Sequence, residues 1–299
     1  MGMSEKYAHL RPSTRLFADE DAASRIRRIR TDRWIGYARA EAVLAALEDL
    51  LSFPKRLRMP NLLLIGPTNN GKTMIVEKFR RTHLAAVGEP AEGPALIPVL
   101  KVQMPSGPDE GRFFGAILDA LGMPFGPRDR IAAKQDAAVH LMRATKVRLL
   151  VIDELHNLLS GTVLQQRRLL NVLRWLGNEL QIPLVGVGTA EALRAIRSDE
   201  QLANRFEPWP LPLWTDDEEY RRLLTTLEAV LPLRKPSHLT DPAMAARIIS
   251  AAEGVLGEII AIVIRAAVKA VETGTETISA RMIERAGFIR PSERRRVAI

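Results

Sequence analysis

The sequence predicts an α/β fold, with a parallel sheet flanked by helices and a helical lid after it. Three patterns lead to this prediction. Short apolar runs alternate with helical segments over the first two-thirds of the chain, as in βαβ units. A glycine-rich segment follows the first of these runs and opens a helix. From Thr215 onward only helical periodicity remains, which indicates a separate helical part.

The strands of the sheet are predicted from short apolar runs. Runs rich in β-branched and aliphatic residues suit strands buried on both faces of a parallel sheet. The last strand is a Pro-rich extended segment. The predicted strands are residues 61–65, 95–104, the run from 147 that ends at Asp153-Glu154, 182–188, and 207–213.

The helices are predicted from apolar residues that recur on one face. In the α/β part they are the later portion of 32–51, a helix starting at 74–80, and 112–121, 131–145, 164–180, 190–197 and 199–205. In the lid they are 216–230, 241–252, 257–273 and 279–286. We therefore divide the chain into a basic N-terminal extension (1–33), an α/β domain (34–213), the lid (214–289) and a basic tail (290–299).

The composition excludes several classes of protein. The chain has 299 residues, of which 46% are hydrophobic and 26% charged, as in ordinary globular proteins. The absence of cysteine excludes disulfides, zinc-thiolate sites and cysteine nucleophiles. No stretch of about eighteen residues is free of charges, so we expect no membrane-spanning helix. The N-terminus lacks an apolar segment like that of a signal peptide, and we expect a cytoplasmic protein.

The glycine-rich segment is a P-loop in the context that supports it. G-x-x-x-x-G-K-T follows an apolar strand and precedes a helix. Backbone N–H groups of such a loop, and the positive end of the helix, face phosphate oxygens. The predicted contacts to ATP come from Gly66, Pro67, Thr68, Asn69, Asn70, Gly71, Lys72, Thr73 and Met74. Lys72 is expected at the β- and γ-phosphates and Thr73 at Mg²⁺. A chance glycine turn before a helix is the alternative interpretation.

Two acids end the central apolar run. Asp153 and Glu154 are predicted at the carboxyl end of a parallel strand, where α/β sheets bind ligands. Asp153 is expected in the Mg²⁺ shell, and Glu154 is expected to polarise the attacking water. A solvated acidic turn is the alternative. A Glu directly after the Asp favours ATP hydrolysis, and it is not what a small-molecule kinase needs.

Four further positions are candidates for the nucleotide site. Thr189 ends a predicted strand and can sense the γ-phosphate or position water, although a helix N-cap is the alternative. Arg205 precedes the last strand and can reach a neighbouring subunit's ATP, whereas a surface ion pair is the alternative. Trp34 and Tyr37 precede the P-loop and can stack on adenine, or they can pack in a core.

These motifs together resemble AAA+ ATPases and, among them, the TniB family of transposition proteins. The resemblance covers about residues 30–290 and includes the 34–37 segment, Arg58-Met59-Pro60-Asn61, GPTNNGKT, VIDELHNLL, VGVGTAEA and LANRFEPWPL. It implies a bacterial ATPase that forms a homo-oligomer, either a ring or a helical filament, on target DNA. It also implies that the protein recruits a DDE-type transposase and acts as a regulator, without joining DNA strands itself.

One segment departs from the AAA+ pattern. Many AAA+ proteins place a sensor arginine at the start of a late lid helix. Residues 253–259 read EGVLGEI, and the next arginine is Arg265, two turns later. A missing cation reduces stabilisation of transition-state charge, so we expect slow hydrolysis.

The basic balance of the chain permits DNA binding. The net charge is +8 and the pI about 10.1, and no base-reading module is evident. Contacts to backbone phosphates of double-stranded DNA are expected from Lys101, Arg128, Arg130 and Lys134. Ordinary surface charge is the alternative for each of them. Arginine-rich segments at 25–33 and 290–296 can bind DNA or partners, or remain solvated.

Three other functions compete with a transposition regulator. A helicase or replication loader is expected to carry a partner-binding or winged-helix domain, for which the tail after Gly287 is short. A signalling switch that holds ATP without hydrolysis does not need Glu154. A small-molecule kinase lacks an evident acceptor site.

Overall fold

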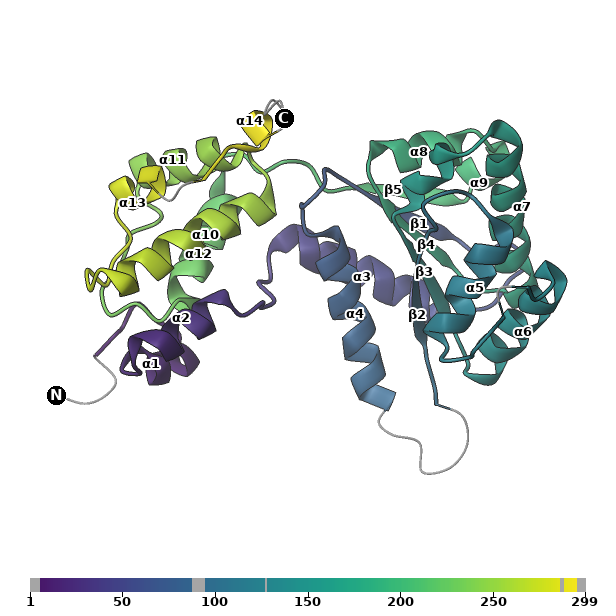
Figure 1. The fold of residues 1–299 in the computed structure, drawn as a ribbon, viewed down its shortest axis with the longest axis horizontal. Helices are drawn as coiled ribbons and strands as arrows, with labels where there is room; N and C mark the ends of the chain where they lie inside the picture. The colour runs from purple at the N-terminus through teal and green to yellow at the C-terminus, as the bar shows by residue number, and fades with distance from the viewer. Residues whose placement is uncertain (1–5, 88–94, 127, 286–287, 295–299) are drawn as a thin grey trace. The chain divides into compact units, whose positions relative to one another are not determined.

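The computed structural model describes residues 6–87, 95–126, 128–285 and 288–294. These residues form two compact units. Residues 39–212 make an α/β unit, and the described residues within 1–38 and 213–299 make a helical unit. Figure 1 shows both units along the colour ramp.

The α/β unit contains a five-stranded parallel sheet in the order β2-β3-β4-β1-β5. The strands are β1 (Asn61–Ile65), β2 (Val99–Gln103), β3 (Leu149–Asp153), β4 (Leu184–Gly188) and β5 (Phe206–Pro210). Each predicted strand is present. The limits of β1 are those predicted, β2, β3 and β4 are shorter than predicted, and β5 begins one residue earlier and ends three residues earlier. The predicted α/β fold class is confirmed.

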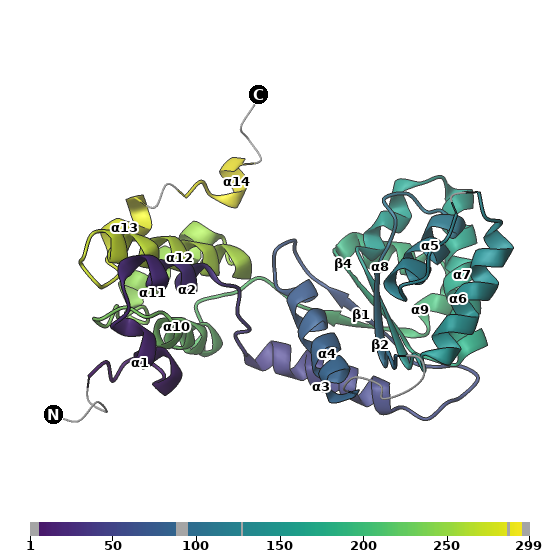
Figure 2. The same cartoon turned by 60° about the horizontal axis from the view of Figure 1, so that its bottom comes forward.

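Helices cover both faces of this sheet (Figures 1 and 2). On one face lie α3 (Ala38–Ser52) and α4 (Lys72–Val87). On the other lie α5 (Glu110–Ala120), α6 (Ile131–Ala144), α7 (Val163–Leu180), α8 (Ala190–Arg197) and α9 (Glu200–Ala203). A short 3₁₀ helix, η1 (Leu155–Ser160), follows β3. Because alternate strand residues point to opposite faces, the strands must be apolar on both sides, and β3 and β4 are buried throughout.

The helical unit joins the two ends of the chain. It contains α1 (Pro12–Ala18), α2 (Ala22–Arg30), α10 (Glu218–Val230), α11 (Pro242–Ala252), α12 (Leu256–Glu272), α13 (Ala280–Arg285) and α14 (Pro291–Arg294). Helix α2 packs against α12, and Ile29 is fully buried in the shared core. A separate N-terminal extension was expected over residues 1–33. The described part of this segment is instead packed into the helical unit, because the lid helices cover its apolar face.

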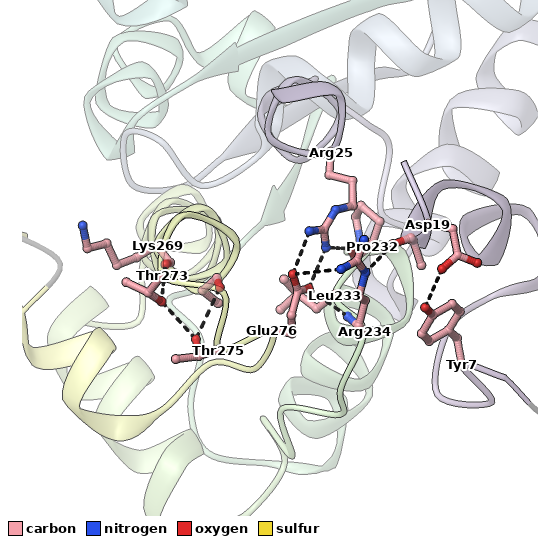
Figure 3. Close-up of polar contacts among 12 residues, drawn as sticks. Tyr7, Asp19, Arg25, Pro232, Leu233, Arg234, Lys269, Thr273, Thr275 and Glu276 are labelled. Atoms are coloured by element: carbon pink, nitrogen blue, oxygen red, sulfur yellow. Dashed lines mark hydrogen bonds and ion pairs between the residues drawn. The ribbon is translucent and has the colours of Figure 1, made fainter. Parts of the chain in front are cut away.

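A buried ion pair fixes α2 in this unit. Arg25 Nη1 and Nη2 donate to Glu276 Oε2 and Oε1 at 2.6 and 2.7 Å. The two side chains are only 3% and 9% exposed. Figure 3 shows Arg25, Glu276 and Arg234 converging from separate segments. The arginines predicted as a DNA-binding or solvated segment thus include one that is structural.

Some predictions concern residues outside the described ranges. The last residue of the predicted 279–286 helix and the last residues of the basic tail, 295–299, belong to this group. Within the described residues, no helix has the length and apolarity needed to cross a membrane.

Candidate functional site

The P-loop connects β1 to α4 and depends on two glycines. Gly71 has a φ of 87°, a conformation that costs little only for glycine. At Gly66 a Cβ would lie 2.6 Å from the carbonyl oxygen of Leu211, so only glycine allows that close approach. Asn70 is buried and its amide donates to the carbonyls of Leu211 and Pro212 at 3.0 Å each. The segment after β5 thus fixes the loop.

Lys72 lies at the N-terminus of α4 and is buried, with 8% exposure. Its Nζ donates to the carbonyl oxygens of Gly66 and Pro67 at 2.8 and 2.6 Å. Burial lowers the pKa of Lys72, while the nearby carboxylates of Glu154 and Asp153 act to raise it. A buried ammonium held mainly by carbonyl dipoles is suited to receive an anion.

The carboxylate of Asp153 gathers three donors. Its Oδ2 accepts from Thr73 Oγ1 at 3.1 Å and lies 3.2 Å from Lys101 Nζ. Its Oδ1 accepts the backbone N–H of Glu154 at 3.0 Å. The predicted pair of Thr73 and Asp153 is therefore brought together at one edge of the sheet. Lys101 also lies here, although the sequence analysis expected it at a DNA-facing surface.

This arrangement fits Mg²⁺ accompanied by a nucleotide. The described residues contain no group of three or more His, Cys, Asp or Glu side chains able to hold a metal. Mg²⁺ needs none, because it is usually bound through one or two carboxylates plus substrate phosphates and water. The Thr73 hydroxyl lies at hydrogen-bond distance from the Asp153 carboxylate, and the Lys101 ammonium contacts the same carboxylate oxygen. The site therefore accommodates a cation.

Glu154 follows β3 in a left-handed conformation, with φ 55° and ψ 37°. A non-glycine residue in this region is uncommon and is often found at functional sites. Its Oε2 lies 3.1 Å from His156 Nε2. His156 Nδ1 is buried without a hydrogen-bond partner among the described residues. His156 was not singled out from the sequence, and its position two residues after Glu154 was the available signal.

Thr189 is the N-cap of α8, and its side chain accepts from Glu191 N at 3.4 Å. It directly follows Gly188, whose carbonyl accepts the N–H of Gly66 in the P-loop at 3.2 Å. Thr189 therefore caps a helix, which was the alternative interpretation of this position. Its position beside the P-loop is also the one expected for a phosphate sensor, and that role stays a prediction.

Arg205 lies near the amino-terminal end of β1, whereas the P-loop follows the carboxyl end of that strand. The carbonyl of Arg205 accepts the N–H of Asn61, the first residue of β1, at 2.9 Å. Its guanidinium donates to Asn178 at 2.8 Å. Burial lowers the pKa of Arg205, and the positive charges of Arg58 and Arg174 lower it further. This group of three arginines was not recognised as a group from the sequence.

Trp34 and Tyr37 both belong to the helical unit. The Tyr37 ring meets the Trp214 ring edge-on, with centroids 5.1 Å apart. Trp34 lines a pocket of about 360 Å³ with residues of α1, α2 and the end of α10. Tyr37 therefore packs against another aromatic ring, which was the alternative to adenine stacking. Adenine stacking stays a prediction for both residues.

The predicted DNA contacts differ in exposure. Arg128 and Arg130 are exposed near the start of α6. Lys134 is buried, with 8% exposure, and its Nζ lies 4.7 Å from the centre of the Phe125 ring. The position of Lys134 on α6 turns its side chain toward Phe125, so it is less accessible than Arg128 and Arg130. Its contact with DNA stays a prediction.

The start of α12 contains an acid instead of a sensor arginine. Glu258 is buried and forms an ion pair with Arg294. Arg265 is exposed and its guanidinium lies 5.7 Å from the centre of the Phe288 ring. Where many AAA+ proteins have a sensor arginine, the start of α12 therefore has the carboxylate of Glu258.

Comparisons with known proteins agree with this geometry. The structures that match include the ORC2 protein of Aeropyrum pernix with ADPNP and ADP, at 19% identity and a TM-score of 0.62 over 87% of this chain and 71% of that one. The ORC1 protein of the same organism, in complex with DNA, matches with the same identity and TM-score over 87% and 68%. A Walker-type ATPase of Pyrococcus abyssi matches at 12% identity and a TM-score of 0.55 over 83% and 69%.

These structural likenesses establish the AAA+ fold. No curated protein matches the sequence. A family model described as "Bacterial TniB protein" matches residues 25–216, which include the P-loop, the Asp153-Glu154 pair, Thr189 and Arg205. This range is more than half of the chain. The protein therefore belongs to the TniB family of transposition proteins, and its fold is that of AAA+ ATPases.

Proposed function

We propose that this protein is an ATP-dependent, DNA-binding regulator of transposition. It oligomerises on double-stranded target DNA and recruits or activates a DDE-type transposase. The observation that carries the proposal is the meeting of Lys72, Thr73, Asp153 and Glu154 at one edge of the sheet. The family supports the transposition role.

Each residue of this edge has a role in ATP hydrolysis. Lys72 binds the β- and γ-phosphates, and Thr73 with Asp153 holds Mg²⁺, which neutralises phosphate charge when bound. Glu154 orients and polarises the attacking water. Thr189, at the end of β4 beside the P-loop, contacts the γ-phosphate or that water. Trp34 and Tyr37 remain candidates for adenine stacking.

Arg205 supports an oligomer because of its distance from the P-loop of its own chain. Five residues of β1 separate the two positions, which is about 16 Å at about 3.3 Å per strand residue. That span exceeds the length of an arginine side chain. We therefore assign Arg205 to the nucleotide of a neighbouring subunit, where a guanidinium stabilises transition-state charge.

Hydrolysis is expected to be slow. Buried Glu258 lies at the start of α12, and the first arginine of that helix, Arg265, lies against Phe288. A lid without the sensor cation contributes less to stabilising the transition state. A slow ATPase suits a regulator, because the ATP-bound assembly then persists on DNA long enough to be recognised.

DNA binding is proposed through phosphate contacts without sequence preference. The net charge of +8 and the exposed Arg128 and Arg130 support it. The ORC1 relative of similar fold is a complex with DNA. Lys101 contributes in this way only when it is not bound to Asp153. Such contacts weaken steeply with added salt.

Electron microscopy of the protein with duplex DNA tests this proposal. Samples with ATP, ADP or no nucleotide are compared, with Lys72→Ala as control. Rings or filaments on DNA only with ATP, and absent in Lys72→Ala, are expected. DNA-bound assemblies in no state would contradict the proposal and favour a loader or a signalling ATPase.

A further inference from the structure

Lys101 is a second lysine at the nucleotide site, in addition to the P-loop lysine. Its Nζ lies 3.2 Å from Asp153 Oδ2, and the two side chains are 22% and 9% exposed. The same oxygen accepts from Thr73 at 3.1 Å. An ion pair this well shielded is stronger than one at the surface.

The register of the sheet explains this contact. Lys101 on β2 pairs with Val151 on β3, two residues before Asp153. Side chains two residues apart share a face of the sheet, so Lys101 and Asp153 both point toward α4, which carries Thr73. The contact is therefore built into the pairing of β2 with β3.

Three donors occupy most of the roughly four acceptor positions of the Asp153 carboxylate, and both positions of Oδ2 are used. Oδ1 accepts the Glu154 N–H, and Oδ2 is shared by Thr73 and Lys101. The Thr73 hydroxyl bonds to Oδ2, so a Mg²⁺ ion held jointly by Thr73 and Asp153 meets this oxygen. There it must share Oδ2 with the ammonium or displace it. Two cations on one oxygen repel each other, most strongly where water is scarce.

We propose that Lys101 is a positioning residue that competes with Mg²⁺ for Asp153. The inference rests on the assignment of Thr73 and Asp153 to Mg²⁺ in the proposed function. Lysine suits this role because its ammonium sits on a flexible four-carbon stem and can move away. Mg²⁺ then enters together with ATP, because phosphate charge offsets the repulsion between the two cations.

The test is the Mg²⁺ dependence of ATP binding by the full chain. A fluorescent ATP analogue is titrated with Mg²⁺ after removal of metal by chelation. Lys101→Met should lower the half-saturating Mg²⁺ concentration by about tenfold, because a positive charge no longer opposes the ion. Lys101→Arg, which keeps the charge, should stay close to the wild type.

Lys78→Met is the matched control, since Lys78 is an exposed lysine on α4. It should leave the Mg²⁺ titration unchanged. Thermal unfolding gives a second readout. Lys101→Met should melt below the wild type in chelator, where Asp153 lacks a cation, and this difference should shrink with Mg²⁺ and ATP.

The outcomes separate this inference from the proposed function. An unchanged or higher Mg²⁺ requirement in Lys101→Met, with a normal wild-type titration, would overturn the inference alone, since Lys101 would then merely support Asp153. Wild-type protein that fails to bind ATP, or binds it without any dependence on Mg²⁺, would overturn the proposed function as well.

Discussion

Lys72 in the α/β unit and Arg25 in the helical unit are both buried cations with different partners. Lys72 is 8% exposed and Arg25 is 2% exposed. Lys72 donates to two backbone carbonyls, and burial lowers its pKa. Arg25 forms a double hydrogen bond with Glu276, and this contact holds the pKa of Arg25 above its ordinary value (Figure 3).

The difference shows how a ligand site can be told from a structural ion pair. Burial of a charge is not enough, because both cations are buried. The charge of a cation that is paired with an acid, as Arg25 is with Glu276, is already neutralised within the fold. A cation held by carbonyls or amides, such as Lys72 or Arg205, has no directly bonded acid among the described residues. Such cations mark places where an anionic group is expected.

Arg25→Met should give the largest loss of stability. It leaves Glu276 buried without its closest cation, which costs about 3–5 kcal/mol of unfolding free energy. Urea denaturation followed by circular dichroism measures this loss. Arg25→Met combined with Glu276→Leu should recover a large part of it. Equal stability of the single variant and the wild type would contradict a structural role.

Glu154→Gln should lower the rate of ATP hydrolysis by about 10²-fold or more, since it removes the group that polarises water. ATP affinity should change little, because the amide keeps the size of the side chain. Phosphate release and equilibrium binding of ATP measure the two effects. Hydrolysis at the wild-type rate would exclude Glu154 as the activating residue.

Lys72→Ala should weaken ATP binding by about 100-fold, the loss of one charged hydrogen-bonding group of roughly 1.5–3 kcal/mol. Its stability without nucleotide should be unchanged or higher, because a buried cation without a bonded acid is removed. This outcome is opposite to that for Arg25→Met. Calorimetric titration and urea denaturation test it, and a large loss of stability would break the comparison.

Acid should weaken the helical unit through Glu276. Burial acts to raise the pKa of Glu276, but hydrogen bonds from Arg25 and from the backbone of Arg234 outweigh it, and the pKa is lowered. The stability it contributes is therefore present above the unfolded pKa, about 4.3, and is lost as pH falls through the lower folded pKa. Unfolding free energy measured below about pH 4.3 should fall less steeply in Arg25→Met combined with Glu276→Gln.

Local patterns in the sequence predicted the strands and the residues that meet at the P-loop. Apolar runs predicted β1 to β4, a Pro-rich extended segment predicted β5, and the motif spacing placed Lys72 and Thr73 near Asp153. The division of the chain was less predictable. Ile29 is buried against helices more than two hundred residues away, and no local pattern encodes such a pairing.

The environments of individual cations were also hard to predict. Lys101 and Lys134 were both expected to be available for DNA, yet one contacts Asp153 and the other the Phe125 ring. Strand register decides the first contact and helix orientation the second. Arg128 and Arg130, by contrast, are exposed as expected.

The central claim is that a subunit's ATP is hydrolysed with the help of Arg205 from its neighbour. Mixing Arg205→Ala with Glu154→Gln tests this claim most directly, with each variant inactive by itself. An interface that joins the intact Glu154 of one variant to the intact Arg205 of the other should be active. We predict ATP hydrolysis in the mixture well above the sum of the separate variants in the presence of DNA. A mixture no more active than that sum, although both variants assemble, would contradict the account.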